Sequence, residues 1–109
     1  MGTASGPGSM DQLAAILRNA GFDVQVGQYA LRIQGIARTF ELADLGDPSP
    51  ETRFMVDGSG YGVPVEQVAR GCERLARCLR EHNLAHDFLH VSDDDRQEVF
   101  GEYLFTPPD

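Results

Sequence analysis

The sequence contains no lysine, only two cysteines and no long apolar run. The lack of lysine carries little functional weight, whereas the other two features bear on the compartment and on the possible partners of the protein. Its nine basic residues are all arginine and stand against 17 acidic residues, which gives a formal net charge of −8. Because an acidic chain repels phosphate backbones, we expect no nucleic acid among its partners. No stretch approaches the roughly 18 apolar residues of a membrane span, so we expect no membrane partner. The acidity favours solubility and attraction to a basic protein.

The two cysteines, Cys72 and Cys78, lie on one predicted helix, about 9 Å apart along its axis at the usual rise per residue. This separation exceeds the roughly 7 Å limit between the Cα atoms of a disulfide, so the two residues cannot pair with each other. Two unpaired thiols are typical of a reducing compartment, and we expect a cytoplasmic protein. Cys72 falls on the apolar face of the helix, whereas Cys78 falls at its margin, where we expect it to be accessible.

Signals of catalysis are weak. The sequence has no Gly-x-Ser-x-Gly elbow and no Cys–His pair that its pattern would bring together. Carboxylates are plentiful, but the spacing of no two of them singles them out as a catalytic pair. We therefore predict a protein that is not an enzyme and holds no cofactor.

Residues 1–9 read Met-Gly-Thr-Ala-Ser-Gly-Pro-Gly-Ser and lack an apolar pattern, as is typical of a vector-derived leader. We expect these residues to be disordered, with a native start at Met10 and a single domain over residues 10–109. A chain of this size buries about two-thirds of its unfolded surface, which allows one modest core.

Periodicity predicts two amphipathic helices and five or six strands. A short helix over residues 11–21 ends at Gly21, and a long helix runs from Pro64 to Asn83. Strands are predicted at residues 22–26 and 29–33, after Gly35, at 52–57, near 86–92 and at 98–105. Short turns between neighbouring strands favour an α+β fold, with both helices packed on one side of an antiparallel sheet, in the order α-β-β-β-(β)-α-β-β.

Gly58, Gly60 and Gly62 fall between a predicted strand and the N-terminus of the long helix. Backbone N–H groups in such a loop, together with the helix dipole, can hold an anion or the phosphate of a nucleotide. The G-x-G-x-G spacing, however, matches neither the dinucleotide fingerprint nor a P-loop. Two interpretations stay open: a small-anion or nucleotide-ligand site, and a loop that needs glycine to reverse direction.

Three histidines, His82, His86 and His90, recur at steps of four residues. Because the long helix is expected to end at Asn83, His86 and His90 should share one face of the following strand. With His82 nearby and the acidic turn 93–95 they could recruit a zinc ion, although no standard zinc motif supports this. We favour hydrogen-bonded or exposed histidines and predict no metal.

The last predicted strand is apolar on both of its faces. Phe100 and Leu104 fall on one side, and Val99, Tyr103 and Phe105 fall on the other. Two helices can cover only one side of a sheet, so we expect one of these sides to be exposed. We predict that Phe100, Tyr103, Leu104 and Phe105 bind a protein partner or a second copy of the chain, with strand addition at a sheet edge as one route.

An opening helix that ends at Gly21, a strand meander, a helix that ends at Asn83 and a closing hairpin resemble the type III secretion chaperone-like fold, including the small bacterial YbjN-type proteins. The resemblance covers most of residues 11–105. It implies a small, acidic, cytoplasmic protein that is often dimeric, and the secretion chaperones of this fold hold an extended effector segment. We expect a chaperone-like or adaptor protein. The alternative is an immunity protein whose acidity neutralises a basic toxin.

Overall fold

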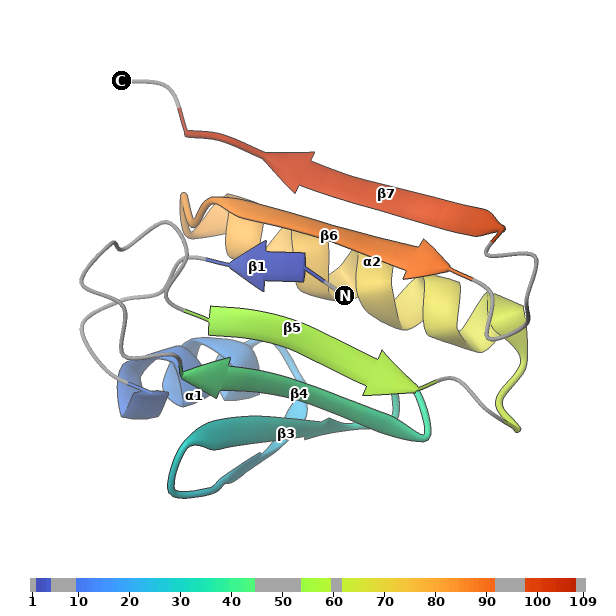
Figure 1. Ribbon diagram of the computed structural model, residues 1–109. Helices are drawn as coiled ribbons and strands as arrows, with labels where there is room; N and C mark the ends of the chain where they lie inside the picture. The colour runs from blue at the N-terminus through green and yellow to red at the C-terminus, as the bar shows by residue number, and fades with distance from the viewer. Residues whose placement is uncertain (1, 5–9, 45–53, 60–61, 92–97, 108–109) are drawn as a thin grey trace.

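The computed structural model describes residues 2–4, 10–44, 54–59, 62–91 and 98–107. These residues form two helices and seven strands (Figure 1). In chain order the elements are β1 (Gly2–Ala4), α1 (Met10–Asn19), β2 (Asp23–Val26), β3 (Ala30–Gln34), β4 (Thr39–Asp44), β5 (Phe54–Ser59), α2 (Val65–Glu81), β6 (His86–Val91) and β7 (Val99–Phe105). The predicted α+β fold, with two helices and an antiparallel sheet, is thereby confirmed.

All seven strands join one sheet in the order β2-β3-β4-β5-β1-β6-β7, and each neighbouring pair is antiparallel. The first four strands after α1 follow one another as a meander. β5 and β6 both run antiparallel to β1, which lies between them, so they run parallel to each other. Helix α2 connects these two parallel strands, as such a crossover requires.

The strand β1 corrects the expectation that the sheet has five or six strands, and it shows residues 2–4, which were expected to be disordered, as a strand. Gly2, Thr3 and Ala4 pair with β5 on one side and β6 on the other, and Ala4 is fully buried. A Gly-Thr-Ala segment has no apolar alternation, so periodicity cannot reveal it as a strand. Its place is set by the two strands that flank it. Residues 1 and 5–9 lie outside the described residues.

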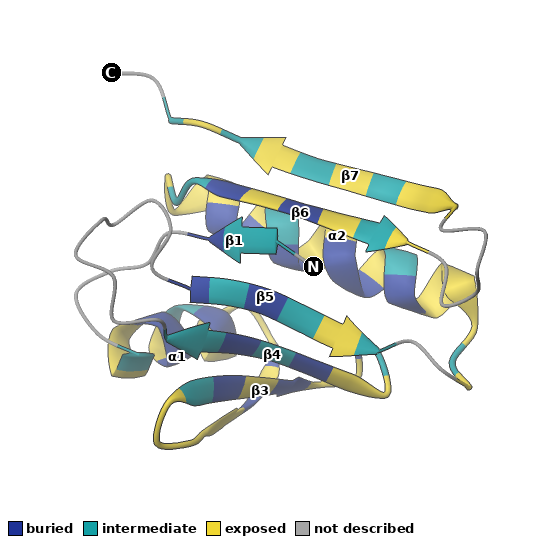
Figure 2. Cartoon of the chain, viewed as in Figure 1, coloured by how far each residue is buried: buried dark blue, intermediate teal, exposed yellow. Residues whose placement is uncertain are grey.

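Both helices lie on one face of the sheet, as predicted (Figure 1). Helix α1 contacts β2 and β3, while α2 contacts β6 and β7. Buried residues alternate with intermediate or exposed residues along most of the strands, as expected for a sheet that is covered on one face (Figure 2). The largest fully buried side chains are Leu13, Leu17, Leu31, Leu42, Phe54, Val56, Leu75, Leu79 and Phe88. We call the two sides of the sheet the helix-covered face and the open face.

The ends of both helices follow from local chemistry. Gly21 has a φ of 93° just after α1, and Asn83 has a φ of 58° just after α2. Glycine and asparagine are the residues that adopt this left-handed conformation most readily. Across the two helices, the Arg74 guanidinium lies 4.6 Å from the centroid of the Phe22 ring. This contact ties α2 to the turn that leads into β2.

Candidate functional site

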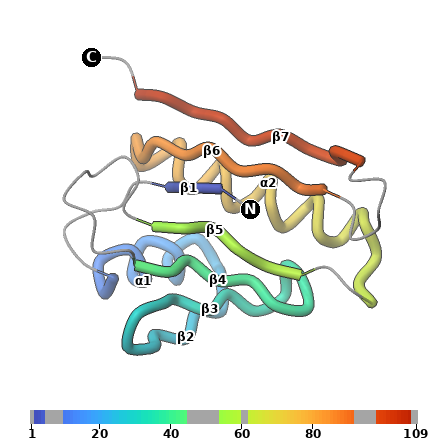
Figure 3. The backbone as a smooth tube through the Cα atoms, in the orientation of Figure 1, coloured from blue at the N-terminus to red at the C-terminus, as the bar shows by residue number. Residues whose placement is uncertain are grey.

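Strand β7 (Val99–Phe105) forms one edge of the sheet. Among the described residues it pairs with β6 alone, in a register that sets Leu104 opposite Asp87 and Phe105 opposite His86. Figure 3 shows β7 running along the margin of the molecule. An edge strand presents backbone N–H and C=O groups to which a further strand can bond. This edge is the backbone component of the candidate site.

Two of the four predicted binding residues, Tyr103 and Phe105, point to the helix-covered face and are half-buried. The Tyr103 ring stacks on Phe88 with ring centroids 4.9 Å apart, and its hydroxyl donates a hydrogen bond to the Ala69 carbonyl at 3.4 Å. Burial raises the pKa of Tyr103. The Phe105 ring lies 5.8 Å from the His86 ring. These aromatic rings therefore hold β7 against α2 and β6.

A β-bulge changes the alternation of side chains at the start of β7. Val99 lies opposite Val91, and the register then shifts, so that Phe100 is the extra residue. The Phe100 ring packs 5.1 Å from the ring of His90, between centroids, and is 40% exposed. The predicted grouping of Phe100 with Leu104 on one side is therefore wrong. A bulge inserts one extra residue into a strand, and a prediction that assumes strict alternation of side chains assigns the residues before the bulge to the wrong face.

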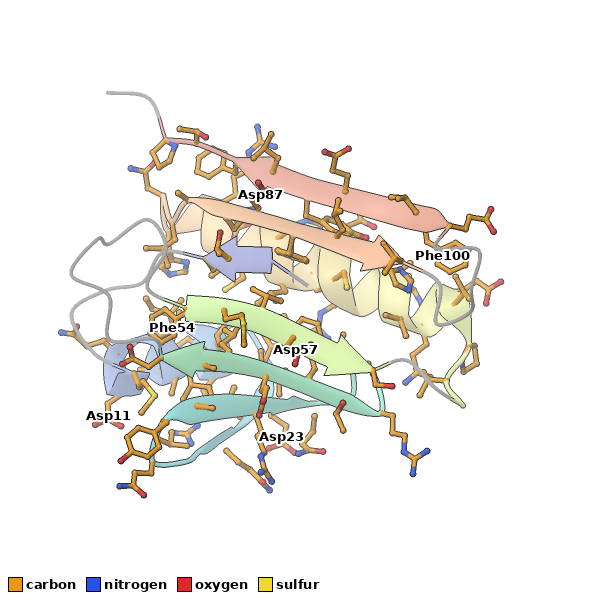
Figure 4. The ribbon with its side chains drawn as sticks, viewed as in Figure 1. Asp11, Asp23, Phe54, Asp57, Asp87 and Phe100 are labelled. Carbon is orange, nitrogen blue, oxygen red and sulfur yellow. The ribbon has the colours of Figure 1, made fainter. Side chains whose placement is uncertain are left out.

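The open face of β6 and β7 carries exposed apolar side chains, of which Leu104 is 65% and Val99 is 55% exposed. Together with two exposed residues of β6 they form what we call the outer β6–β7 patch: Leu89, Val91, Val99 and Leu104. Asp87 and Glu102 lie among them on the same face, because Asp87 is opposite Leu104 and Glu102 is opposite Leu89. Figure 4 labels Asp87 beside β7 and Phe100 at its far end. Apolar and acidic side chains therefore alternate on this part of the open face.

Sequence reasoning missed the contribution of β6 to this patch. Leu89 and Val91 alternate with Phe88 along a strand that was predicted correctly, so the signal was present in the sequence. The three histidines fall on or before the other face of that strand, so a prediction based on them does not include Leu89 and Val91. Leu104 was the one predicted binding residue that lies fully on the open face.

A groove of about 300 Å³ runs between α2 and β7 on the other side of the edge. Its walls include Glu73, Arg77, Arg80, Tyr103 and Phe105. Arg77 and Glu73 form an exposed ion pair at 3.5 Å, and the Arg80 guanidinium lies 5.4 Å from the centroid of the Phe105 ring. A strand added beside β7 would place alternate side chains over the outer patch and toward this groove.

The histidines are held by local contacts. The Nδ1 atom of His82 lies 2.9 Å from the Cys78 carbonyl, and that of His86 lies 3.1 Å from the Leu84 carbonyl. Within the described ranges, no three His, Cys, Asp or Glu side chains are grouped so as to hold a metal ion. The acidic turn 93–95 lies outside those ranges.

The glycines proposed for anion binding have separate structural roles. Gly58 belongs to β5, where an added Cβ would lie 2.5 Å from the Thr39 carbonyl oxygen, and its N–H donates to the Asp57 carboxylate at 2.9 Å. Gly62 has a φ of 79°, which favours glycine in the turn before α2. Gly60 lies outside the described residues. Anion binding by this loop stays a prediction.

A hollow of about 570 Å³ lies beside Gly58, on the open face between β3, β4 and β5. Arg32 and Arg38 line it, but so do Glu41 and Asp57. The two pairs of opposite charges balance, so the hollow offers no net attraction to an anion.

Both cysteines are buried thiols. Burial raises the pKa of Cys72 to about 11 and also raises that of Cys78. The expectation that Cys78 is accessible is wrong, since it is only 4% exposed. A thiol with a raised pKa carries little thiolate at neutral pH and is a weak nucleophile.

Comparison with protein-family models, with curated proteins and with solved structures found no match. The helices of the described residues are too short or too polar to cross a lipid bilayer.

Proposed function

We propose that this chain is a non-enzymatic, cytoplasmic protein-binding module, chaperone-like or adaptor in kind, that receives an extended segment of a partner along β7. One observation carries the proposal: β7 is an edge strand that borders an apolar patch on the open face and a groove on the other. Strand addition at such an edge gives affinity through main-chain hydrogen bonds and specificity through alternate side chains.

The charge around β7 favours a basic partner. Asp87 and Glu102 flank the outer β6–β7 patch, and the chain as a whole carries a net charge of −8. Opposite charges on the two surfaces raise the rate of encounter and select against acidic competitors. A basic toxin, as in the immunity-protein alternative, is one partner of this chemistry. A second copy of the chain would bring like charges together at this edge, so self-association should grow with salt concentration.

The test compares two exposed apolar residues at opposite ends of the sheet. Leu104→Asp places a charge in the outer β6–β7 patch, and Tyr29→Asp places one at a site that is 70% exposed near β3. Each variant, immobilised, is used to capture proteins from the lysate of the source cells, and the eluates are compared by quantitative mass spectrometry.

A partner whose recovery falls at least roughly tenfold with Leu104→Asp and is unchanged with Tyr29→Asp supports the proposal, since a charge in a desolvated contact is unfavourable by more than ~1.4 kcal/mol. Equal recovery with both variants contradicts it. Tyr103→Asp is unsuited to this test, because Tyr103 packs on Phe88 and its loss would disturb the fold.

A further inference from the structure

The sheet contains a slot one strand wide between β5 and β6. These two strands are parallel, are linked through α2, and are separated by β1, which pairs with both (Figures 1 and 3). The slot runs beside Phe54–Val56 on one wall and His86–Phe88 on the other. Each wall strand has six residues, and β1 has three.

The strand in this slot brings little apolar surface for a central strand. Gly2 and Ala4 point to the helix-covered face and bring almost no apolar surface, while Thr3 points to the open face. Buried apolar area is the main source of strand stability, and a glycine and an alanine supply little of it. Backbone hydrogen bonds, each contributing about 0.5–1.5 kcal/mol, supply most of the rest.

The slot selects small side chains on the helix-covered face. A Cβ atom added to Gly2 would collide with the Asp87 carbonyl oxygen and with the Cα atom of Phe88, and it would lie 2.6 Å from the Cβ atom of Phe88. Ala4, two residues along, is fully buried. A strand in this slot must therefore carry glycine and then a residue no larger than about alanine at these two positions.

The central position has a different preference. Thr3 lies opposite Met55 on one wall and opposite Asp87 on the other, and Asp87 is exposed on the open face. A lysine or arginine in place of Thr3 would form an oppositely charged cross-strand pair with Asp87, which stabilises a sheet by roughly 0.2–1 kcal/mol. The threonine of β1 does not provide this pairing, which a basic residue in a competing strand would add.

We propose that the slot between β5 and β6 is a second strand-binding site, which accepts from a partner protein an extended segment of the pattern Gly–basic–Ala in place of β1. The segment runs antiparallel to both walls, as β1 does. This site is distinct from the β7 edge, and neither proposal requires the other.

The first experiment uses the full chain and a labelled peptide, Ser-Gly-Lys-Ala-Ser, followed by fluorescence anisotropy. In the variant Gly2→Val the new side chain expels β1 from the slot. A peptide can bind only those molecules whose slot is open, so occupancy of the slot by β1 lowers the apparent affinity for the peptide. With β1 expelled, the apparent affinity should rise roughly tenfold or more. The control peptide Ser-Val-Lys-Val-Ser should not bind, and adding Leu104→Asp should leave peptide binding unchanged.

A second variant covers the case in which Gly2→Val disturbs folding. Thr3 and Met55 are direct cross-strand partners, and Cα atoms at such positions lie about 4.5–5.5 Å apart, within the range of a disulfide. The double variant Thr3→Cys, Met55→Cys should lose peptide binding when oxidised and regain it after reduction.

Three outcomes would overturn the inference. A folded Gly2→Val variant could bind the peptide no better than the parent chain, or the oxidised staple could leave peptide binding intact. Alternatively, Gly2→Val could abolish a dimer that the parent chain forms, which would show that the slot takes β1 from a second copy rather than a partner segment. Size-exclusion chromatography with light scattering distinguishes this last case.

Discussion

The open face of the sheet has two halves that differ in chemistry although one layer of helices lies behind both. On β3 and β4 the exposed side chains are polar, with Arg32 directly opposite Glu41. On β6 and β7 the same face carries the outer β6–β7 patch. The meander half therefore shows the apolar-in, polar-out alternation of a sheet that faces water, whereas the β6–β7 half also carries exposed apolar side chains on its open face, next to Asp87 and Glu102.

This difference favours the β6–β7 half as the side of the proposed contact with another protein. Burial behind the sheet is similar in the two halves, since Leu42 and Phe88 are both almost completely buried. Exposed leucine and valine side chains on the β6–β7 half add little to the stability of the folded chain. An exposed apolar patch with a polar margin is the usual mark of an interaction surface.

The largest expected effect concerns the core that both halves share. Phe54→Ala removes a fully buried ring from β5, next to β1 and β4, and should lower the free energy of unfolding by about 3–5 kcal/mol. The matched control is Met55→Ala, on the same strand but on the open face. Urea unfolding followed by circular dichroism measures both. A similar loss from the two variants would contradict a one-sided core.

A smaller effect is expected where α2 meets the meander half. A Cβ atom added at Gly71 would lie 2.6 Å from Cγ2 of Ile36, a side chain that is 2% exposed and cannot move aside. Overpacking of about 1–3 kcal/mol exceeds the gain in helix propensity of about 1 kcal/mol, so Gly71→Ala should destabilise the fold by about 1 kcal/mol. The control is Arg70→Ala, on the exposed side of the same helix, which should change the urea midpoint little. If Gly71→Ala stabilised the fold, the Ile36 side chain would be able to move away from the added methyl group.

The β6–β7 half should be sensitive to mild acid through His86. Burial lowers the pKa of His86 below its ordinary value of 6.5, with a further lowering by the nearby Arg80 and opposing effects of the Leu84 carbonyl and Asp87. The unfolded chain therefore binds a proton that the folded chain does not, so stability falls as pH decreases from 6.5 toward the lower folded pKa and is unaffected above 6.5.

The measurement is the urea midpoint at pH 7.5, 6 and 5 for the parent chain and for His86→Phe, which cannot titrate. The parent chain should lose more stability over this range than the variant. Parallel curves would show that His86 does not govern the acid sensitivity of this half.

The smallest expected effect is at the patch itself. Leu104→Ala should change the free energy of unfolding by less than about 0.5 kcal/mol, because Leu104 is mostly exposed. Tyr103→Ala, its neighbour on the helix-covered face, should be clearly more destabilising. If Leu104→Ala were as destabilising as Tyr103→Ala, the patch would belong to the core of the folded chain.

Elements with strong periodicity could be predicted from the sequence, and elements fixed by their neighbours could not. The alternation of apolar and polar residues predicts β3 and β4, and Pro64 and Asn83 predict where α2 begins and ends. Strand β1 and the bulge at Phe100 depend on pairing with distant strands, which no local pattern encodes. The binding residues of β7 were predicted on the right strand, but only the bulge decides on which face Phe100 lies.

The buried arc of α2 was also predicted imperfectly, for a reason that lies in one glycine. Gly71 and Cys78, on one flank of the helix, are both buried, although Cys78 was predicted to lie at the margin of the apolar face. Hydropathy counts glycine as neutral, but its missing side chain lets Ile36 approach the helix closely. The helix is therefore rotated toward that flank, which buries Cys78.

The position of β1 between β5 and β6 also dictates the order in which the chain can fold. The meander from β2 to β5 closes through contacts between neighbours in the sequence, which form early because their loops are short. Strand β1 precedes both of its partners in the chain, so its pairing on both sides requires β5 and β6 to be in place. We therefore expect β1 to complete its pairing late in folding.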